Sequence, residues 1–217
     1  MSIPFFKNCG PLTEAYVCDI LEIKGSNNNN EIRDIKDLYT AEENDVTFFH
    51  STKYINFAKN TKASFCITSN NLKDYLPKNC KPLIVKNVLV SMSKITSKFY
   101  PSSINDNFDD SVLDINETKF SNNVQFGKNV LIGNNVSIGN NCSIGHNTII
   151  EHSVSIGNNC SIGSNVIIRN TVIKNSVNIL DNCIIGKHGF GFFPIKDNNL
   201  RYPHIGVVII EDNCEIG

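Results

Sequence analysis

The chain has 217 residues, of which 41% are hydrophobic, and its formal net charge at pH 7 is −1. This balance, without a run of lysines or arginines, argues against a nucleic-acid partner. No stretch of about 18 apolar residues is present to form a transmembrane segment.

Eight cysteines are present, but none forms a CxxC or CxxxC pair that would indicate zinc. The opening residues MSIPFFKNCG lack the basic and apolar regions of an export signal. We therefore expect free thiols in a cytoplasmic protein. The sequence predicts no metal site and no cofactor.

Residues 1–100 alternate strand-like and helix-like segments. DVTFFH, ASFCITS and KPLIVK are rich in residues that favour strands, and KYINFAKNT and VSMSKITSKFY have apolar residues at helical spacing. This alternation predicts a small α/β domain. Pro101, followed by serines and asparagines, marks the expected boundary with a second domain, 101–217.

Within the first domain, TFFHSTKY places Phe48, Ser51 and Tyr54 at three-residue intervals where a strand gives way to a helix. Two aromatic rings beside a small polar side chain could hold a flat base by stacking and by a hydrogen bond to its edge. Aromatic residues at the start of a helix also occur simply as core residues, and spacing alone does not separate the two interpretations.

After the boundary, a six-residue repeat fills residues 122–169. Each repeat has two inward positions, two residues apart, followed by a corner rich in Gly and Asn, which tolerate turn conformations. This period predicts a parallel β-helix in which Cys142 and Cys160 are stacked core residues. The aliphatic and aromatic residues in phase are Phe126, Ile132, Ile138, Ile144, Ile150, Ile156, Ile162 and Ile168.

The period slips once after Ile168 and is interrupted between Ile185 and Ile210, whose separation is not a multiple of six. We therefore expect residues 187–206 to leave the coil as a loop at a corner, where insertions line a binding face. GKHGFGF in this loop is not followed by a helix, so it does not suit a phosphate cradle. Its phenylalanines could pack on the protein or form an apolar wall for a substrate.

His146 and His152 lie six residues apart on corresponding corners, and His188 begins the loop. Three histidines could form the zinc site of a β-helical carbonic anhydrase. Residues on adjacent faces of one prism diverge, however, so this set would need a subunit boundary to bring it together. Solvated corners are the simpler interpretation.

The α/β segment VTFFHSTKY…ASFCITS…KPLIVKN, the hexads, and the GFGF loop closed by HIGVVIIEDNCEIG together resemble the UDP-3-O-(3-hydroxyacyl)glucosamine N-acyltransferases of lipid A synthesis in Gram-negative bacteria. The resemblance implies a left-handed parallel β-helix, a homotrimer, and transfer of a 3-hydroxyacyl chain from acyl carrier protein to the 2-amine of the UDP-glucosamine derivative. It also implies that residues 1–100 bind the uridine nucleotide.

The resemblance carries over site residues one by one. The family motif Phe-x-x-Asn-x-x-Tyr falls on Phe48, Ser51 and Tyr54, with Ser51 in place of Asn. The aromatic loop implies substrate contacts from His188, Phe190 and Phe192. The family base, a His in a His-Asn corner, follows the aromatic loop, whereas the His-Asn pair at 146–147 precedes it.

We therefore expect the catalytic base to lie beyond Gly217, and the β-helix of this chain to be incomplete, inactive by itself and without its cap. Two alternatives stay open. The first is a nucleotide-binding and trimer-forming fragment without catalysis. The second is another hexapeptide enzyme, such as a sugar O-acyltransferase or a β-helical carbonic anhydrase.

Overall fold

The computed structural model describes residues 5–24, 28–105, 107–115, 123–196 and 198–217. These residues divide into two compact units. Among the described residues, one unit contains residues 6–105 together with 190–204, and the other contains residues 5, 107–115, 123–189 and 205–217. Each unit is described separately below.

The first unit is built on the four-stranded parallel sheet β3-β4-β5-β6. Its strands are Asp34–Ile35, Asp45–Phe49, Phe65–Thr68 and Lys81–Ile84, the last three of which the sequence predicted. Two further short strands, β1 (Leu12–Thr13) and β2 (Glu31–Ile32), pair antiparallel. The helical elements are α1 (Glu14–Ile20), η1 (Thr52–Tyr54), α2 (Ile55–Lys59), η2 (Lys73–Tyr75), α3 (Val88–Phe99) and η3 (Pro101–Ile104).

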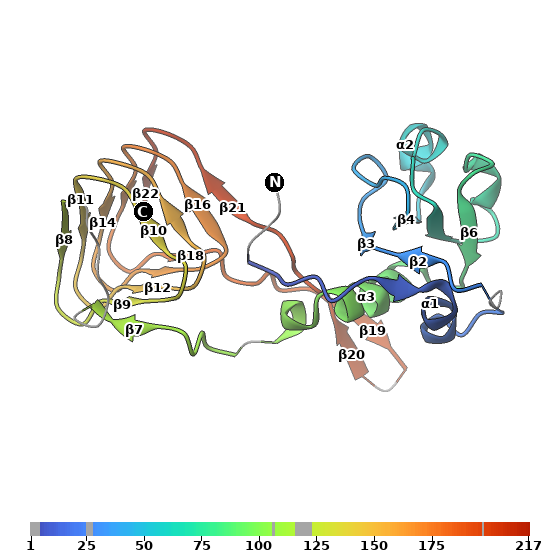
Figure 1. Cartoon of the computed structure of the whole chain (residues 1–217), viewed down its shortest axis with the longest axis horizontal. Helices are drawn as coiled ribbons and strands as arrows, with labels where there is room; N and C mark the ends of the chain where they lie inside the picture. Colours follow the sequence, from blue (N-terminus) through green and yellow to red (C-terminus); the bar gives the residue numbers. More distant parts are fainter. Residues whose placement is uncertain (1–4, 25–27, 106, 116–122, 197) are drawn as a thin grey trace. The chain divides into compact units, whose positions relative to one another are not determined.

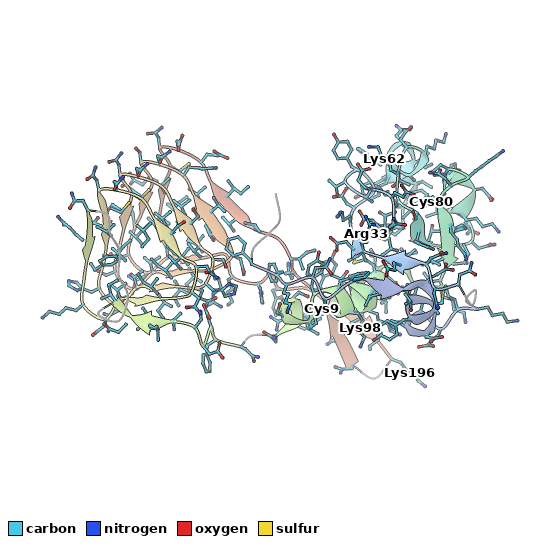
Figure 2. The ribbon with its side chains drawn as sticks, in the orientation of Figure 1. Cys9, Arg33, Lys62, Cys80, Lys98 and Lys196 are labelled. Carbon is cyan, nitrogen blue, oxygen red and sulfur yellow. The ribbon has the colours of Figure 1, made fainter. Side chains whose placement is uncertain are left out.

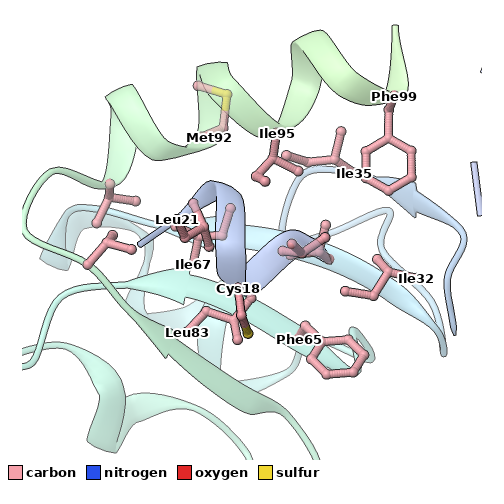
Figure 3. Packing of buried hydrophobic residues seen from close by; sticks show 14 residues of the cluster. Cys18, Leu21, Ile32, Ile35, Phe65, Ile67, Leu83, Met92, Ile95 and Phe99 are labelled. Atoms are coloured by element: carbon pink, nitrogen blue, oxygen red, sulfur yellow. The ribbon is translucent and has the colours of Figure 1, made fainter. Parts of the chain in front are cut away.

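Alternation along the buried strand β5 divides the core between the two faces of the sheet. Phe65 and Ile67 join α1 and α3 in one cluster, while Cys66 joins Phe49 and Ala58 in the other. In Figure 3, Met92, Ile95 and Phe99 of α3 point towards the sheet residues. Asn87 accepts a hydrogen bond from the backbone N–H of Val90 (3.1 Å) and so caps the start of α3.

Residues 190–204 form a hairpin that the sequence did not predict. Strands β19 (Phe192–Ile195) and β20 (Asn198–Arg201) pair antiparallel. The Ser93 hydroxyl of α3 donates to the carbonyl of Arg201 (3.4 Å), and the N–H of His204 donates to the carbonyl of Ser103 (3.2 Å). Tyr202 packs against the core cluster beneath α3, so these residues group with 6–105.

The second unit is the predicted parallel β-helix (Figure 1). Its strands, mostly two residues long, stack into sheets ordered β10-β13-β16-β21, β22-β17-β14-β11-β8 and β18-β15-β12-β9-β7. This confirms the expected fold class: a mainly β, left-handed parallel β-helix preceded by a small α/β domain.

The strands from β8 to β15 pair 18 residues apart, as the hexads predict. The slip after Ile168 then shortens the coil, so that Ile156 pairs with Ile173, 17 residues on. The strands are β7 (Leu113–Asp114), β8 (Val124–Phe126), β9 (Leu131–Ile132), β10 (Ser137–Ile138), β11 (Cys142–Ile144), β12 (Ile149–Ile150), β13 (Ser155–Ile156), β14 (Ser161–Ile162), β15 (Ile167–Ile168), β16 (Thr171–Ile173), β17 (Asn178–Ile179), β18 (Ile184–Ile185), β21 (Val208–Ile210) and β22 (Glu215–Ile216).

The corners explain the abundance of asparagine. Corner asparagines such as Asn129, Asn147 and Asn165 have φ of +57 to +58°, the left-handed region that Asn tolerates better than most residues. Their side-chain amides also form a ladder, in which Asn129 donates to Asn147 (3.1 Å) and Asn147 to Asn165 (3.3 Å). Gly139 precedes such a corner because a Cβ there would lie 2.6 Å from the carbonyl oxygen of Gly157.

All eight cysteines lie in the described residues and each is free. Cys9 is exposed and Cys80 is buried (Figure 2). Cys142 and Cys160 stack inside the β-helix as predicted, with the backbone N–H of Cys160 donating to the Cys142 sulfur (3.4 Å). They are therefore core residues of the coil.

Replacement of Ile162 with alanine tests the inward direction that the hexads assign. Ile162 is 2% exposed, so Ile162→Ala should lower the free energy of unfolding by about 2–5 kcal/mol by leaving a cavity. Its outward neighbour Ser161 is the control, because Ser161→Ala should change stability by only about 0.5 kcal/mol. Urea unfolding measures both, and equal losses would contradict the assigned directions.

Candidate functional site

An aromatic pocket of about 320 Å³ opens in the α/β unit where β4 ends. Its walls come from the residues after β3, from the end of β4, and from η1 and α2. The structure thus brings Phe48 and Tyr54 together in one pocket. The lining residues are Asp37, Leu38, Tyr39, Phe48, His50, Tyr54 and Phe57.

Strand periodicity determines which residues at the end of β4 and just after it reach the pocket. Phe48 and His50 are two residues apart and share one side of the strand, whereas Phe49 points into the opposite core cluster. The rings of Phe48 and His50 are stacked at 6.4 Å between centroids, and His50 and Tyr54 are 5.4 Å apart with a 46° tilt. These three rings form a continuous aromatic wall.

The pocket rim is also aromatic. Tyr39 and Phe57 meet edge to face with ring centroids 6.2 Å apart. Tyr39 is 80% exposed, and Phe57 and Tyr54 are 49% and 42% exposed. Large apolar rings left open to water around a pocket are typical of a binding site for a flat, partly apolar group.

Ser51 lies between Phe48 and Tyr54, at the start of η1. Its hydroxyl accepts a hydrogen bond from the backbone N–H of Lys53 (3.4 Å) and caps η1. Ser51 is not among the described residues that line the pocket. Its contribution is therefore to start the 3-10 turn that carries Tyr54 to the pocket wall.

Asp37 stabilises the turn at residues 37–40, which forms another wall of the pocket. Its carboxylate accepts hydrogen bonds from the backbone N–H groups of Tyr39 (2.8 Å) and Thr40 (2.9 Å) and from the Thr40 hydroxyl (2.8 Å). Partial burial favours a higher pKa for this carboxyl, but the hydrogen bonds from Thr40 and Tyr39 outweigh it and the pKa is lowered.

Sequence reasoning missed Asp37, Tyr39, His50 and Phe57. His50 lies within the quoted motif TFFHSTKY, two residues after Phe48, so strand alternation alone could have placed it in the pocket. Phe57 lies three residues after Tyr54, at helical spacing. Asp37 and Tyr39 come from a separate turn, and nothing in their local sequence indicates the pocket.

The predicted residues of the aromatic loop fall in different units. His188 is partly buried and belongs to the β-helix unit, whereas Phe190 and Phe192 belong to the α/β unit. Phe190 is 95% exposed and meets Phe192 edge to face at 5.1 Å. Phe193 and Tyr202 instead pack together at 5.3 Å, so the hairpin has one face held against the unit and one exposed aromatic pair.

The two corner histidines have separate partners. The ring Nδ1 of His146 accepts from the backbone N–H of Lys128 (2.7 Å), and the backbone N–H of His152 donates to Asp109 (2.6 Å). Among the residues that the structure describes, no group of three His, Cys, Asp or Glu side chains is placed to hold a metal ion.

One outer face of the β-helix is apolar. In the sheet β18-β15-β12-β9-β7, the outward positions of four neighbouring strands are Leu131, Ile149, Ile167 and Ile184, which stack in register. The corresponding outward positions in β8, β11, β14, β17 and β22 are Gln, Ser, Ser, Asn and Glu. We call the four aliphatic residues the aliphatic ladder.

Comparisons with known proteins follow the same division of the chain. Residues 29–98 match the family UDP-3-O-(3-hydroxymyristoyl) glucosamine N-acyltransferase, LpxD, and residues 135–170 match the bacterial transferase hexapeptide family. The matched segment 29–98 contains every residue that lines the aromatic pocket. The resemblance inferred from the sequence is therefore confirmed.

Curated relatives of this chain have names that correspond to the first of these families. The UDP-3-O-acylglucosamine N-acyltransferase of Rickettsia prowazekii is 35% identical over 104 residues, which are 46% of this chain and 30% of the relative. That of Rickettsia typhi is 34% identical with the same coverage, and that of Rickettsia bellii is 33% identical over 100 residues. The match thus spans less than a third of the length of these relatives. Within the described part of the chain, no helix is long and apolar enough to span a membrane.

The lowered pKa of Asp37 predicts how the pocket wall responds to acid. A carboxyl whose pKa is depressed on folding stabilises the fold above its unfolded pKa, and this stabilisation disappears as pH falls through the folded pKa. Asp37→Asn should therefore destabilise the unit at about pH 7 and much less at about pH 3, as measured by urea unfolding. Asp74→Asn, at an exposed carboxyl of η2, is the control; a loss at Asp37 that is independent of pH would contradict the assignment.

Proposed function

We propose that this chain, with its LpxD-family segment and hexapeptide β-helix, acts as a UDP-3-O-(3-hydroxyacyl)glucosamine N-acyltransferase of cytoplasmic lipid A synthesis in a Gram-negative bacterium. The reaction forms an amide bond between the 2-amine of the sugar and the acyl carbon. The thioester C–S bond to acyl carrier protein breaks, and the amine loses a proton. Such a step needs a base and a donor for the oxyanion.

The observation that carries the proposal is the aromatic pocket inside the matched segment. Phe48 and Tyr54 line a cavity whose size and apolar lining suit a flat nucleobase. We assign to this pocket the uracil of the UDP-sugar. The assignment is of substrate binding, and no described residue is given the role of catalytic base.

The exposed aromatic pair of the hairpin supports a second contact with the substrate. We assign Phe190 and Phe192 to an apolar wall for the acyl or sugar portion, and His188 to a polar contact at the start of the loop. The wide exposure of Phe190 supports this role, because burying such a ring against a partner or ligand removes apolar surface from water.

The aliphatic ladder supports assembly as a homotrimer. Stacked, outward-facing Leu131, Ile149, Ile167 and Ile184 make an apolar strip, whereas the outward positions of the sheet β22-β17-β14-β11-β8 are polar. Contact between copies along this strip would bury it.

Binding of uridine monophosphate to the chain tests the proposed function directly. Phe48→Ala and Tyr54→Ala should each weaken binding by about 1–3 kcal/mol because each removes a stacking ring. Tyr16→Ala, which removes an equally exposed aromatic ring from α1 outside the pocket, should leave the affinity unchanged. Isothermal titration calorimetry measures all three.

Three results decide between the candidate functions. Unchanged affinity in Phe48→Ala and Tyr54→Ala would remove the nucleotide from this pocket. Nucleotide binding with no acyl transfer from 3-hydroxyacyl carrier protein to the UDP-sugar would favour a non-catalytic nucleotide-binding role for the chain. Acyl transfer to that amine would favour the enzyme.

The aliphatic ladder gives a separate prediction for assembly. Ile167→Lys places a charge in the middle of the strip, so it should shift the chain from trimer to monomer in sedimentation velocity. Ser161→Lys introduces the same charge on a polar face and should leave the trimer intact. A trimer that survives Ile167→Lys would contradict the role of the ladder.

A further inference from the structure

The aromatic pocket contains a polar ring, His50, that the family motif does not include. Its imidazole lies beside both ring residues of the motif, 6.4 Å from Phe48 and 5.4 Å from Tyr54 between centroids. The side chain lines the pocket and makes no hydrogen bond to a described residue. Its ring nitrogens are therefore open to a ligand.

The other polar groups around the pocket are less suited to reading a base. The Ser51 hydroxyl caps η1 and lies outside the lining. The Asp37 carboxylate already accepts three hydrogen bonds from Tyr39 and Thr40. Tyr39 is 80% exposed on the rim, where water competes for its hydroxyl.

We propose that His50 makes the polar contact with the base and so determines which base the pocket accepts. This inference rests on the proposed function, since it places uracil in the same pocket. A neutral imidazole has one N–H donor and one acceptor nitrogen. The N–H of His50 donates to the uracil O4, which cytosine replaces with an amine donor. Position 50 thereby takes over the role that the resemblance implied for position 51.

Calorimetric titration of uridine and cytidine monophosphates into the full chain and two variants tests the proposal. His50→Phe keeps an aromatic ring in the wall but removes both nitrogens. It should weaken uridine monophosphate binding about five- to tenfold, as expected for one hydrogen bond, and should reduce the preference over cytidine monophosphate. Ser51→Ala removes the cap of the turn that carries Tyr54, so it should weaken the binding of both nucleotides alike and leave the preference unchanged.

The selectivity ratio separates a direct contact from a merely structural role, because a general loosening of the pocket would weaken both nucleotides alike. His50 is exposed just after β4 and Ser51 is at the start of η1, and circular dichroism and thermal unfolding would check that each variant is folded. A second readout is the imidazole nitrogen signals of His50, which should shift when uridine monophosphate binds.

Each result has a distinct meaning. If the unaltered chain binds uridine monophosphate and His50→Phe binds it equally well with the same base preference, the role of His50 is overturned and the proposed function stands. If Ser51→Ala loses the preference instead, the polar contact belongs to position 51. If the unaltered chain does not bind the nucleotide, both the proposed function and the role of His50 fail.

Discussion

Backbone hydrogen bonding between successive coils is the constraint on which the β-helix depends. Strands of two or three residues cannot satisfy their polar groups within themselves, so each must pair with the strand one coil away. This fixes the length of a coil and puts the same side-chain position in register above and below. The corner must then turn sharply at every hexad, which asparagine at positive φ permits.

The same register explains why the coil can carry different surfaces. Inward positions are filled by isoleucine, valine and cysteine, so the interior is fixed by packing. Outward positions are free to differ between faces, and one face has the aliphatic ladder while another has serine and asparagine. In the α/β unit, strand alternation has a comparable effect: Phe49 joins one core cluster, while its neighbour Phe48 packs against the other cluster and lines the pocket.

Periodic features could be predicted from the sequence because a regular pattern has one structural solution. The hexads gave the β-helix, its slip after Ile168 and the stacking of Cys142 on Cys160. The aromatic spacing placed Phe48 and Tyr54 together. What could not be predicted depends on contacts distant in sequence: the hairpin 190–204 packs on α3, and Asp37 and Tyr39 reach the pocket from another turn. The hydrogen bond by which Ser51, a residue of the motif, caps η1 is also a local contact that the motif alone does not indicate.

The central claim is that the pocket of Phe48, His50 and Tyr54 holds the uracil of a UDP-sugar. A crystal structure of the chain soaked with uridine monophosphate tests it most directly. The account predicts the base in this pocket, stacked on an aromatic ring and with a uracil carbonyl within hydrogen-bonding distance of the His50 imidazole. Nucleotide density at another place on the chain, with this pocket filled only by water, would contradict it.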